Sequence, residues 1–380
     1  MGEKVNKVLT IDELADYIKI SKSTLYKLVR EGKVPSRKIG RHWRFHKDVI
    51  DSWFKIKNKT LVSPLRYPGG KRWLSGYISR SIIQNELMPE LFVELFAGGS
   101  SISLKLLQLK LVKRIALIDR DPLIASFWQT VFFDTDWLID QIWKSKITIQ
   151  KWEQMRRLNP VSVRQRAFKC LYLNRTSFSG VLAPSAGPIG GKNQKSKYKI
   201  DCRFKKETLI SRIRKISEYK DRIAFIWNLH WRDAVARILR MQQTGALPEC
   251  ALFYLDPPFY NKADALYTFY FKHADHVSLR DFLIALEQHW ILSYDFCSEI
   301  ISLYKNESFQ ASNVNLVYTA SQKGERGIGK ELIVSNLPRM LSELQLGIGK
   351  KTDNPVHLSE LTNNEVILPD AESVAQGRTL

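Results

Sequence analysis

The tetrapeptide Asp256-Pro257-Pro258-Phe259 is the part of the sequence whose residue types point most directly to chemistry. It follows the apolar run Ala251–Leu255, which is typical of a buried strand, so we expect it at the carboxyl end of that strand. Ligands bind at these strand ends in open α/β sheets. The two prolines fix φ and carry no N–H groups. The sequence therefore predicts a rigid turn that presents a carboxylate, carbonyl oxygens and an aromatic ring.

A turn of this kind suits the methylation of a weakly nucleophilic amine. The lone pair on the exocyclic nitrogen of adenine is delocalised into the ring. The Asp256 carboxylate and a proline carbonyl would accept both N–H groups and leave the lone pair free to attack a sulfonium methyl group, a gain from positioning and electrostatics. Phe259 would stack on the base, which has to leave the duplex to be reached. The alternative is a proline-stiffened strand end with Phe259 in the core.

A second pattern is typical of a nucleotide-binding α/β sheet. The apolar run Phe92–Phe96 predicts a strand, and the turn Ala97-Gly98-Gly99-Ser100 separates it from a helix predicted at 102–109. Glycines after a strand let the backbone approach a cofactor closely, although many such turns are only tight turns. A strand predicted at Arg114–Ile118 ends at Asp119, where an acid can bind ribose hydroxyls. The turn lacks the lysine of a phosphate-binding P-loop, so ATP use is not expected.

Upstream of these strands, the loop Pro64–Lys71 contains a tyrosine ring, two glycines and a lysine. It could hold the carboxylate of an amino-acid cofactor, or it could be a basic loop at the start of a domain. The four cysteines and the histidines show no spacing typical of metal ligands. We therefore expect neither a metal site nor a disulfide framework, and a reducing cytoplasm is the setting that fits.

Length and charge limit the class of protein. The chain has 380 residues, enough for two or three domains, and a formal net charge of +21. This positive charge favours a polyanionic partner such as DNA or RNA; a basic surface without a specific partner is the alternative. No apolar run approaches the length of a membrane span, so a membrane role is not expected.

Residues 1–57 are predicted to form a small separate module. A capping-box signal starts a first helix, Ser21 starts a second helix that stops at Gly32, and a wing at 37–45 precedes a closing helix at 47–54. The second helix would expose polar and basic residues that suit the reading of a DNA groove, namely Ser23, Thr24, Lys27 and Arg30. A helical module that binds another protein is the alternative.

The stretch between the two sheet motifs differs from its surroundings. Residues 127–240 are rich in tryptophan and basic residues and are predicted to be mainly helical, and Lys192–Arg222 contains 12 basic and 4 acidic residues. The α/β pattern resumes at Ala251. Three more strands are predicted at 290–293, 311–319 and 331–336. Residues 347–380 are polar and aperiodic, which predicts a flexible tail.

The order of these motifs resembles the D12 class of N6-adenine DNA methyltransferases, the Dam-like group. The motifs are RYPGGK at 66–71, FVELFAGGS at 92–100, ID at 118–119, LNRTSFSGVL at 173–182, LDPPFY at 255–260 and KELIVSN at 330–336. The resemblance covers roughly residues 61–338. The first module separately resembles the excisionase-like, MerR-like winged-helix family through its run LTIDELADYIKISKSTLYKLVREGKVPSRKIGRHWRF.

The resemblance implies a role for each matching residue. The implied contacts to S-adenosylmethionine are Tyr67 and Lys71 at its methionine part, Glu94, Phe96 and Gly98 along its pocket, Asp119 at its ribose and Asp233 near its adenine. The implied DNA-binding residues are Asn174, Arg175, Phe178 and Gly180, in a segment that includes a base-displacing loop. The implied catalytic residues are Asp256, Pro257, Pro258 and Phe259.

Three positions depart from the family's pattern. Ser179 stands where asparagine is usual, Ser100 where glycine is frequent, and Phe259 where tyrosine is commoner. The change at Ser179 touches the DNA-contacting segment and could alter the choice of target. Phe259 keeps the stacking face and loses only a hydroxyl, so catalysis is still expected.

The expected architecture is α/β, a Rossmann-like class I methyltransferase sheet at 61–340 with an inserted helical target-recognition domain at about 130–235, preceded by a winged helix-turn-helix module. The expected activity is transfer of a methyl group from S-adenosylmethionine to N6 of a flipped-out adenine in double-stranded DNA. The expected setting is the nucleoid in the bacterial cytoplasm, in a bacterium or a phage, with a separate restriction endonuclease as a partner if the enzyme belongs to a restriction system. A cytosine-amine or RNA methyltransferase and a DNA-binding regulator with an inactive methylase domain are the alternatives.

Overall fold

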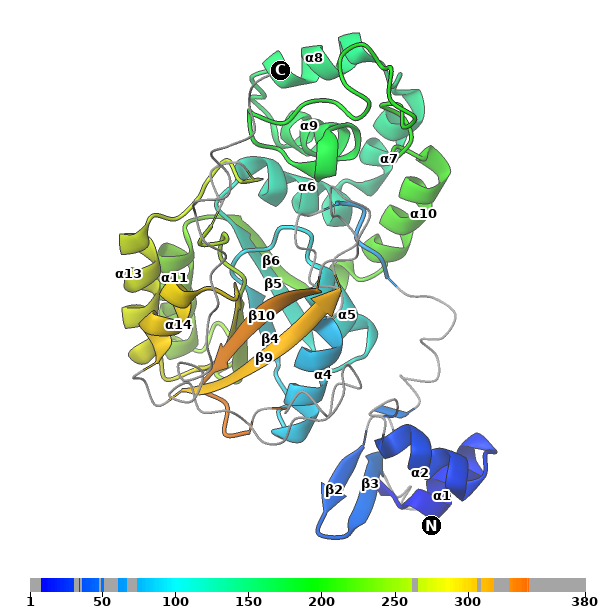
Figure 1. The fold of residues 1–380 in the computed structure, drawn as a ribbon, viewed down its shortest axis with the longest axis vertical. Coiled ribbons are helices and arrows are strands. Elements are labelled where there is room, and N and C mark those ends of the chain that lie inside the picture. Colours follow the sequence, from blue (N-terminus) through cyan, green and yellow to red (C-terminus); the bar gives the residue numbers. More distant parts are fainter. Residues whose placement is uncertain are drawn as a thin grey trace, which may run out of the picture.

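The computed structural model describes residues 8–30, 34, 36–47, 49–50, 61–66, 74–261, 266–305, 309–317, 328–339 and 341. Tyr67, Lys71, most of the closing helix predicted at 47–54 and the tail predicted at 347–380 lie outside these residues. The larger part of the chain forms a sheet with helices on both faces (Figure 1). No helix in the described part of the chain is long and apolar enough to cross a membrane.

A seven-stranded sheet with the order β6-β5-β4-β7-β8-β10-β9 forms the centre of this larger part. Its strands are β4 (Leu91–Glu94), β5 (Arg114–Asp119), β6 (Ile223–Asn228), β7 (Ala251–Leu255), β8 (His289–Asp295), β9 (Gln310–Val317) and β10 (Ile328–Ser335). Strands β6, β5, β4, β7 and β8 run parallel, whereas β10 is antiparallel to β8 and β9. The predicted α/β class is confirmed, as are the strands predicted around 92, 114, 251, 290, 311 and 331.

Strand β4 shows why this sequence builds a layered structure. All four of its side chains are buried, as expected of a parallel strand with helices on both faces. Phe92 belongs to a core with α4, α5 and α6, and Val93 belongs to the opposite core with α11, α13 and α14 (Figure 1). These helices are α4 (Leu74–Gln84), α5 (Ser101–Gln108), α6 (Pro122–Phe133), α11 (Trp231–Gln243), α13 (His273–Ile284) and α14 (Ser298–Tyr304).

The pairing of β4 with β7 determines where the glycine turn and the tetrapeptide lie. The two strands are parallel neighbours, with Leu91 opposite Ala251 and Glu94 opposite Tyr254. The glycine turn follows β4 and the tetrapeptide follows β7. Both segments therefore lie at the same edge of the sheet, although they are far apart in sequence.

The chain leaves the sheet between β5 and β6 to form the helical region, which we define as α7 to α10 (Figure 1). Its helices are α7 (Thr135–Lys144), α8 (Ile149–Arg157), α9 (Val163–Thr176) and α10 (Lys206–Ser217). The structure differs from the insert predicted at about 130–235, because that range includes β6, which pairs with β5. The run Ile223–Asn228 is too short for a stable helix but long enough for a strand.

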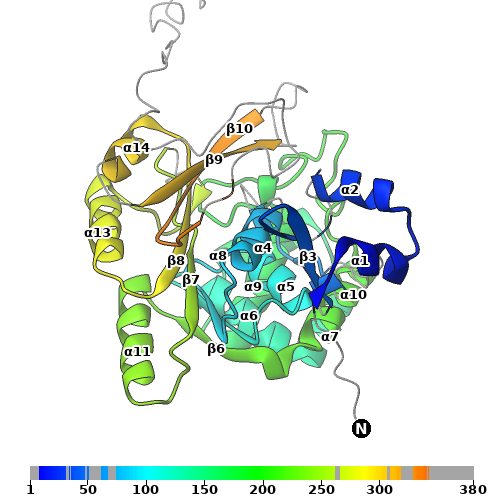
Figure 2. The same cartoon turned by 90° about the horizontal axis from the view of Figure 1, so that it is seen from below.

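The N-terminal module contains β1 (Val8–Leu9), α1 (Ile11–Ile18), α2 (Lys22–Arg30), β2 (Arg37–Ile39) and β3 (His42–His46). Thr10 and Glu13 form the predicted capping box, with bonds of 2.7 and 3.2 Å. The predicted wing is β2 paired with β3, and β1 adds a short strand that was not predicted. Leu14, Leu25 and Phe45 form its buried core, where α1 and α2 lie beside β3 (Figure 2).

Candidate functional site

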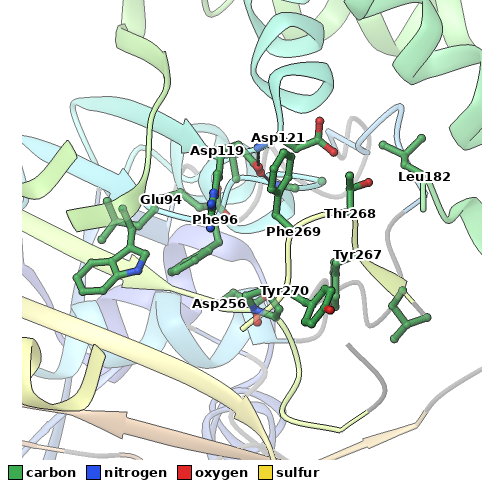
Figure 3. Close-up of a pocket in the computed structure, with 18 of the residues that line it drawn as sticks. Glu94, Phe96, Asp119, Asp121, Leu182, Asp256, Tyr267, Thr268, Phe269 and Tyr270 are labelled. Carbon is green, nitrogen blue, oxygen red and sulfur yellow. Dashed lines mark hydrogen bonds between the residues drawn. The ribbon is translucent and has the colours of Figure 1, made fainter. Parts of the chain in front are cut away.

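A pocket lies at the carboxyl ends of β4, β5 and β7 (Figure 3). Most of the residues predicted for cofactor binding and catalysis line it, namely Glu94, Phe96, Gly98, Asp119, Asp256, Pro258 and Phe259. Pro257 is buried. The sheet thus brings two separate sequence motifs to one pocket.

The glycine turn after β4 is held by side chains from neighbouring elements. The amide of Gly98 donates to Oδ2 of Asp119 at 2.9 Å, and the amide of Asp121 donates to Oδ1 of the same carboxylate at 2.8 Å. The indole Nε1 of buried Trp128 donates to the carbonyl of Gly98 at 2.9 Å. Gly98 has a φ of +42°, a conformation that glycine adopts without strain. Asp119 therefore fixes the turn in addition to facing the pocket.

The wall of the pocket is strongly acidic. Burial is the main reason why the pKa of Glu94 is raised to about 8, and the charges of Asp256 and Asp119 raise it further, against a hydrogen bond from Ser103. Burial, followed by the charge of Asp121, raises the pKa of Asp119 to about 7. Carboxylates in such a setting gain stability from a nearby cation. The pocket of this basic protein is therefore suited to a positively charged small molecule.

The tetrapeptide forms the other side of the pocket. Oδ1 of Asp256 accepts a hydrogen bond from Oγ of Ser293 on β8 at 3.2 Å. The ring of Phe259 meets the ring of Tyr267 edge to face, with 6.0 Å between centroids. A carboxylate thus lies beside aromatic surfaces, an arrangement that can accept the N–H groups of a planar amine and hold its ring.

Sequence reasoning missed several residues of the pocket. Asp121, His230 and Trp231 line it, and so does the segment Leu266–Phe271, in which four of six residues are aromatic. In Figure 3, Tyr267 and Tyr270 lie near Asp256. The aromatic run shortly after the tetrapeptide was a visible signal in the sequence. His230 and Trp231, at the start of α11, carry no local signal because only the pairing of β6 with β5 brings them to this edge.

The predicted DNA-binding residues fall into two groups. Phe178 is 61% exposed and can meet a large ligand. Asn174, Arg175 and Gly180 are buried. Asn174 bonds the backbone of Arg66, and Nε of Arg175 donates to the carbonyl of Pro64 at 2.5 Å. Asn174 and Arg175 thus bond the backbone of the preceding segment, and direct DNA contact by the three buried residues stays a prediction.

Asp233 does not line the pocket. It is exposed in the first turn of α11, two residues beyond Trp231, which does line the pocket. Its proximity to a cofactor adenine stays a prediction, and the pocket residues at the start of α11 are His230 and Trp231.

The second helix of the N-terminal module presents the predicted polar face. Ser23, Thr24, Lys27 and Arg30 on α2 are all exposed, whereas Leu25 and Val29 are buried. Oγ of Ser21 lies 3.0 Å from the Ser23 hydroxyl and 2.8 Å from the Thr24 hydroxyl. The exposed face combines hydroxyl donors at the start of the helix with two cations farther along.

Two family models match the chain. One is described as a helix-turn-helix domain and matches residues 8–55. The other is described as D12 class N6 adenine-specific DNA methyltransferase and matches residues 67–320, about two thirds of the chain.

Two curated proteins are similar to the chain over a short segment. "Putative DNA-binding protein MT0521" and "Putative DNA-binding protein Rv0500A", from two strains of Mycobacterium tuberculosis, are each 36% identical to the chain over 44 residues. That segment is 12% of this chain and 56% of each relative, so the chain spans about half the length of these relatives.

Proposed function

Because the chain belongs to the D12 class of N6 adenine-specific DNA methyltransferases, which use S-adenosylmethionine, we propose that the tetrapeptide after β7 positions the adenine amine for methylation. Double-stranded DNA is the partner, as the helix-turn-helix and methyltransferase families both indicate. The observation that carries the proposal is the pairing of β4 with β7, which gives Gly98 and Asp256 one common pocket.

The residues of the pocket fit S-adenosylmethionine. The cofactor is a cation that carries a transferable methyl group on a sulfonium centre. Glu94 and Asp119 are buried carboxyl groups whose ionised forms a bound cation would stabilise, and Asp119 can also accept hydrogen bonds from ribose hydroxyls. Phe96, Phe271 and Trp231 supply apolar surface for a flat ring. We assign the cofactor's adenine to the side of His230 and Trp231, and we keep Tyr67 and Lys71 as candidates for its methionine part.

The protein's own groups would prepare the amine. Asp256 accepts one N–H of the adenine amine, and a carbonyl of Pro257 or Pro258 accepts the other. These two acceptors direct the nitrogen lone pair away from the ring and toward the methyl donor. Phe259 holds the face of the base, which is flipped out of the duplex. Asp256 acts by accepting hydrogen bonds and forms no covalent bond.

Recognition of DNA would be divided among three parts of the chain. Exposed Phe178 occupies the gap left by the displaced base, and the basic helical region contacts phosphates. Asn174, Arg175 and Gly180 hold the segment that carries Phe178. The exposed face of α2 contacts the bases or phosphates of a second stretch of DNA through Ser23, Thr24, Lys27 and Arg30.

We also propose a biological setting for this activity. We place the enzyme on the nucleoid in the cytoplasm of a bacterium, encoded by the bacterium or by a phage. A separate restriction endonuclease that cuts the same site is its partner if the two form a restriction system.

A direct assay tests the proposal. Purified protein, S-adenosylmethionine and duplex DNA should give N6-methyladenine on nucleoside analysis, and single-molecule sequencing should locate it at one short sequence. Asp256→Ala should lower the rate of transfer about 100-fold or more while cofactor and DNA binding persist. Glu249→Ala, a change at an exposed acid just before β7 that does not line the pocket, is the control. Methylcytosine as the product, or no methylation of any DNA by the wild-type protein, would refute the proposal.

A further inference from the structure

Two of the four residues of the tetrapeptide cannot donate a backbone hydrogen bond. Pro257 and Pro258 carry no N–H, so this part of the loop donates no backbone hydrogen bonds. Asp256 nevertheless has to keep its carboxylate in one orientation for the proposed reaction. Groups from neighbouring elements can supply the restraint that the two prolines cannot.

Strand β8 is the element that runs alongside the loop. Its pairing with β7 extends from Leu252 opposite His289 to Leu255 opposite Leu292. Strand β8 then continues to Asp295, beyond the point at which β7 has ended. Ser293 and Asp295 therefore lie beside the catalytic loop. They lie there because β8 extends three residues past the last pair that it forms with β7.

Ser293 bonds the catalytic carboxylate itself. Its hydroxyl is completely buried and donates to Oδ1 of Asp256 at 3.2 Å. The hydroxyl of Tyr254, also completely buried, lies 2.7 Å from the Ser293 oxygen. A serine hydroxyl has one proton, so when Ser293 donates to Asp256, Tyr254 has to donate to Ser293. Burial, followed by the Asp256 charge, raises the pKa of Tyr254 well above its ordinary value, so this proton is retained.

Asp295 bonds the far end of the loop. Its Oδ1 accepts a hydrogen bond from the backbone N–H of Tyr260 at 3.0 Å, one residue after the tetrapeptide. Ser293 and Asp295 are two residues apart on β8, so their side chains leave the same face of the strand. The loop is thus held at its first residue and just after its last residue by one rigid strand.

We propose that Ser293, supported by Tyr254, and Asp295 are positioning residues for the methyl transfer, which together hold the catalytic loop from both ends. The proposal rests on the assigned function of Asp256. In this proposal, neither Ser293 nor Asp295 contacts the substrate. Each acts through the tetrapeptide, so their loss should slow the chemical step and leave the binding of cofactor and DNA unchanged.

Single-turnover methylation with saturating cofactor and DNA, together with steady-state KM values for both, tests the role of Ser293. Ser293→Ala should lower the rate constant about tenfold, which corresponds to one hydrogen bond to a charged group, and leave the KM values within about twofold. Tyr254→Phe should lower it less and should add little further loss in the Ser293→Ala background, because both changes break one chain of hydrogen bonds.

The role of Asp295 is tested by replacement with a neutral acceptor. Asp295→Ala should lower the rate constant about tenfold, whereas Asp295→Asn keeps an oxygen for the Tyr260 amide and should stay within about twofold of the wild type. An equal loss in the two variants would overturn the loop-holding role, because the charge would then be the property that matters.

Ser335→Ala is the matched control. Ser335 is a completely buried serine on β10 whose hydroxyl donates to the Trp290 carbonyl at 2.6 Å, away from the loop. It should lower the melting temperature without slowing methyl transfer. Equal rate losses in Ser293→Ala and Ser335→Ala, or a loss confined to KM, would overturn the proposal. Failure of the proposed function itself would be distinguishable, because the wild-type protein would then make no N6-methyladenine.

Discussion

The side chain of Asn174 pairs with the backbone of Arg66 as one strand pairs with another. Its Oδ1 accepts the Arg66 amide at 2.7 Å, and its Nδ2 donates to the Arg66 carbonyl at 2.7 Å. Nδ2 also donates to the carbonyl of Gly180 at 2.8 Å. One buried amide therefore joins α9, the segment that enters the methyltransferase fold and the loop that carries exposed Phe178. Two of the predictions below concern this junction.

Gly180→Ala should disrupt the junction. A Cβ atom at Gly180 would lie 2.4 Å from the Arg66 carbonyl oxygen, and φ is +78° there. The clash and the backbone strain should lower the free energy of unfolding by about 2 kcal/mol or more, measured by denaturant titration. DNA methylation should fall with it, because Phe178 and the pocket wall both move. Gly187→Ala, where a Cβ meets nothing within 4 Å, should have little effect; equal losses at both positions would contradict the explanation.

Ser179→Asn should stabilise the protein. Ser179 adopts a φ of +54°, in the left-handed region that asparagine populates more readily than serine. The free energy of unfolding should rise by about 0.5 kcal/mol, since part of the strain is relieved. Ser162→Asn is the control, because Ser162 caps α9 with an ordinary φ of −115° and asparagine caps a helix equally well. An unchanged stability of Ser179→Asn would show that the loop tolerates serine without strain.

The cofactor-free protein should lose stability as the pH rises from about 4 to 8. Burial raises the pKa of Asp119 to about 7 and of Glu94 to about 8, both above their unfolded values. The folded state therefore binds more protons than the unfolded state across this window, and stability falls as these protons leave. Melting temperatures at constant ionic strength should show this slope. Asp119→Asn and Glu94→Gln should each flatten it, and Asp136→Asn on the surface should not.

Lys27→Ala combined with Arg30→Ala should weaken the binding of DNA by the N-terminal module. Both cations are exposed on α2. If each neutralises one phosphate, the slope of log K against log salt should become about 1.8 less negative. The rate constant for methyl transfer in a single turnover at saturating DNA should stay unchanged. An unchanged salt slope would assign this face to a protein partner instead of DNA.

Much of the sheet could be predicted because the signals are local. The runs that became β4, β5 and β7 are short, apolar and bounded by turns, and the acid at the end of β5 follows directly. Strand β6 was missed because Ile223–Asn228 lies within a long basic and helical stretch. Its identity as a strand depends on β5, which is far away in sequence.

The residues that support the site could not be predicted from the sequence for the same reason. Trp128 reaches the Gly98 carbonyl, and Ser293 reaches Asp256, only because helix packing and strand order bring them together. Asn174 and Arg175 could be recognised as belonging to a motif. Their burial depends on the loop at Pro64 and Arg66 and therefore on the folded chain.

The parallel pairing of β4 with β7 has a consequence for how such a protein can arise. The two halves of the pocket are joined by the sheet and not by the polypeptide that connects them. A gene in which the β7 segment preceded the β4 segment would place the same side chains at the same edge. The sheet would therefore bring the cofactor-binding and catalytic segments together whichever came first along the chain, whereas the helical region is tied to the pocket through Gly180, Val181 and Leu182.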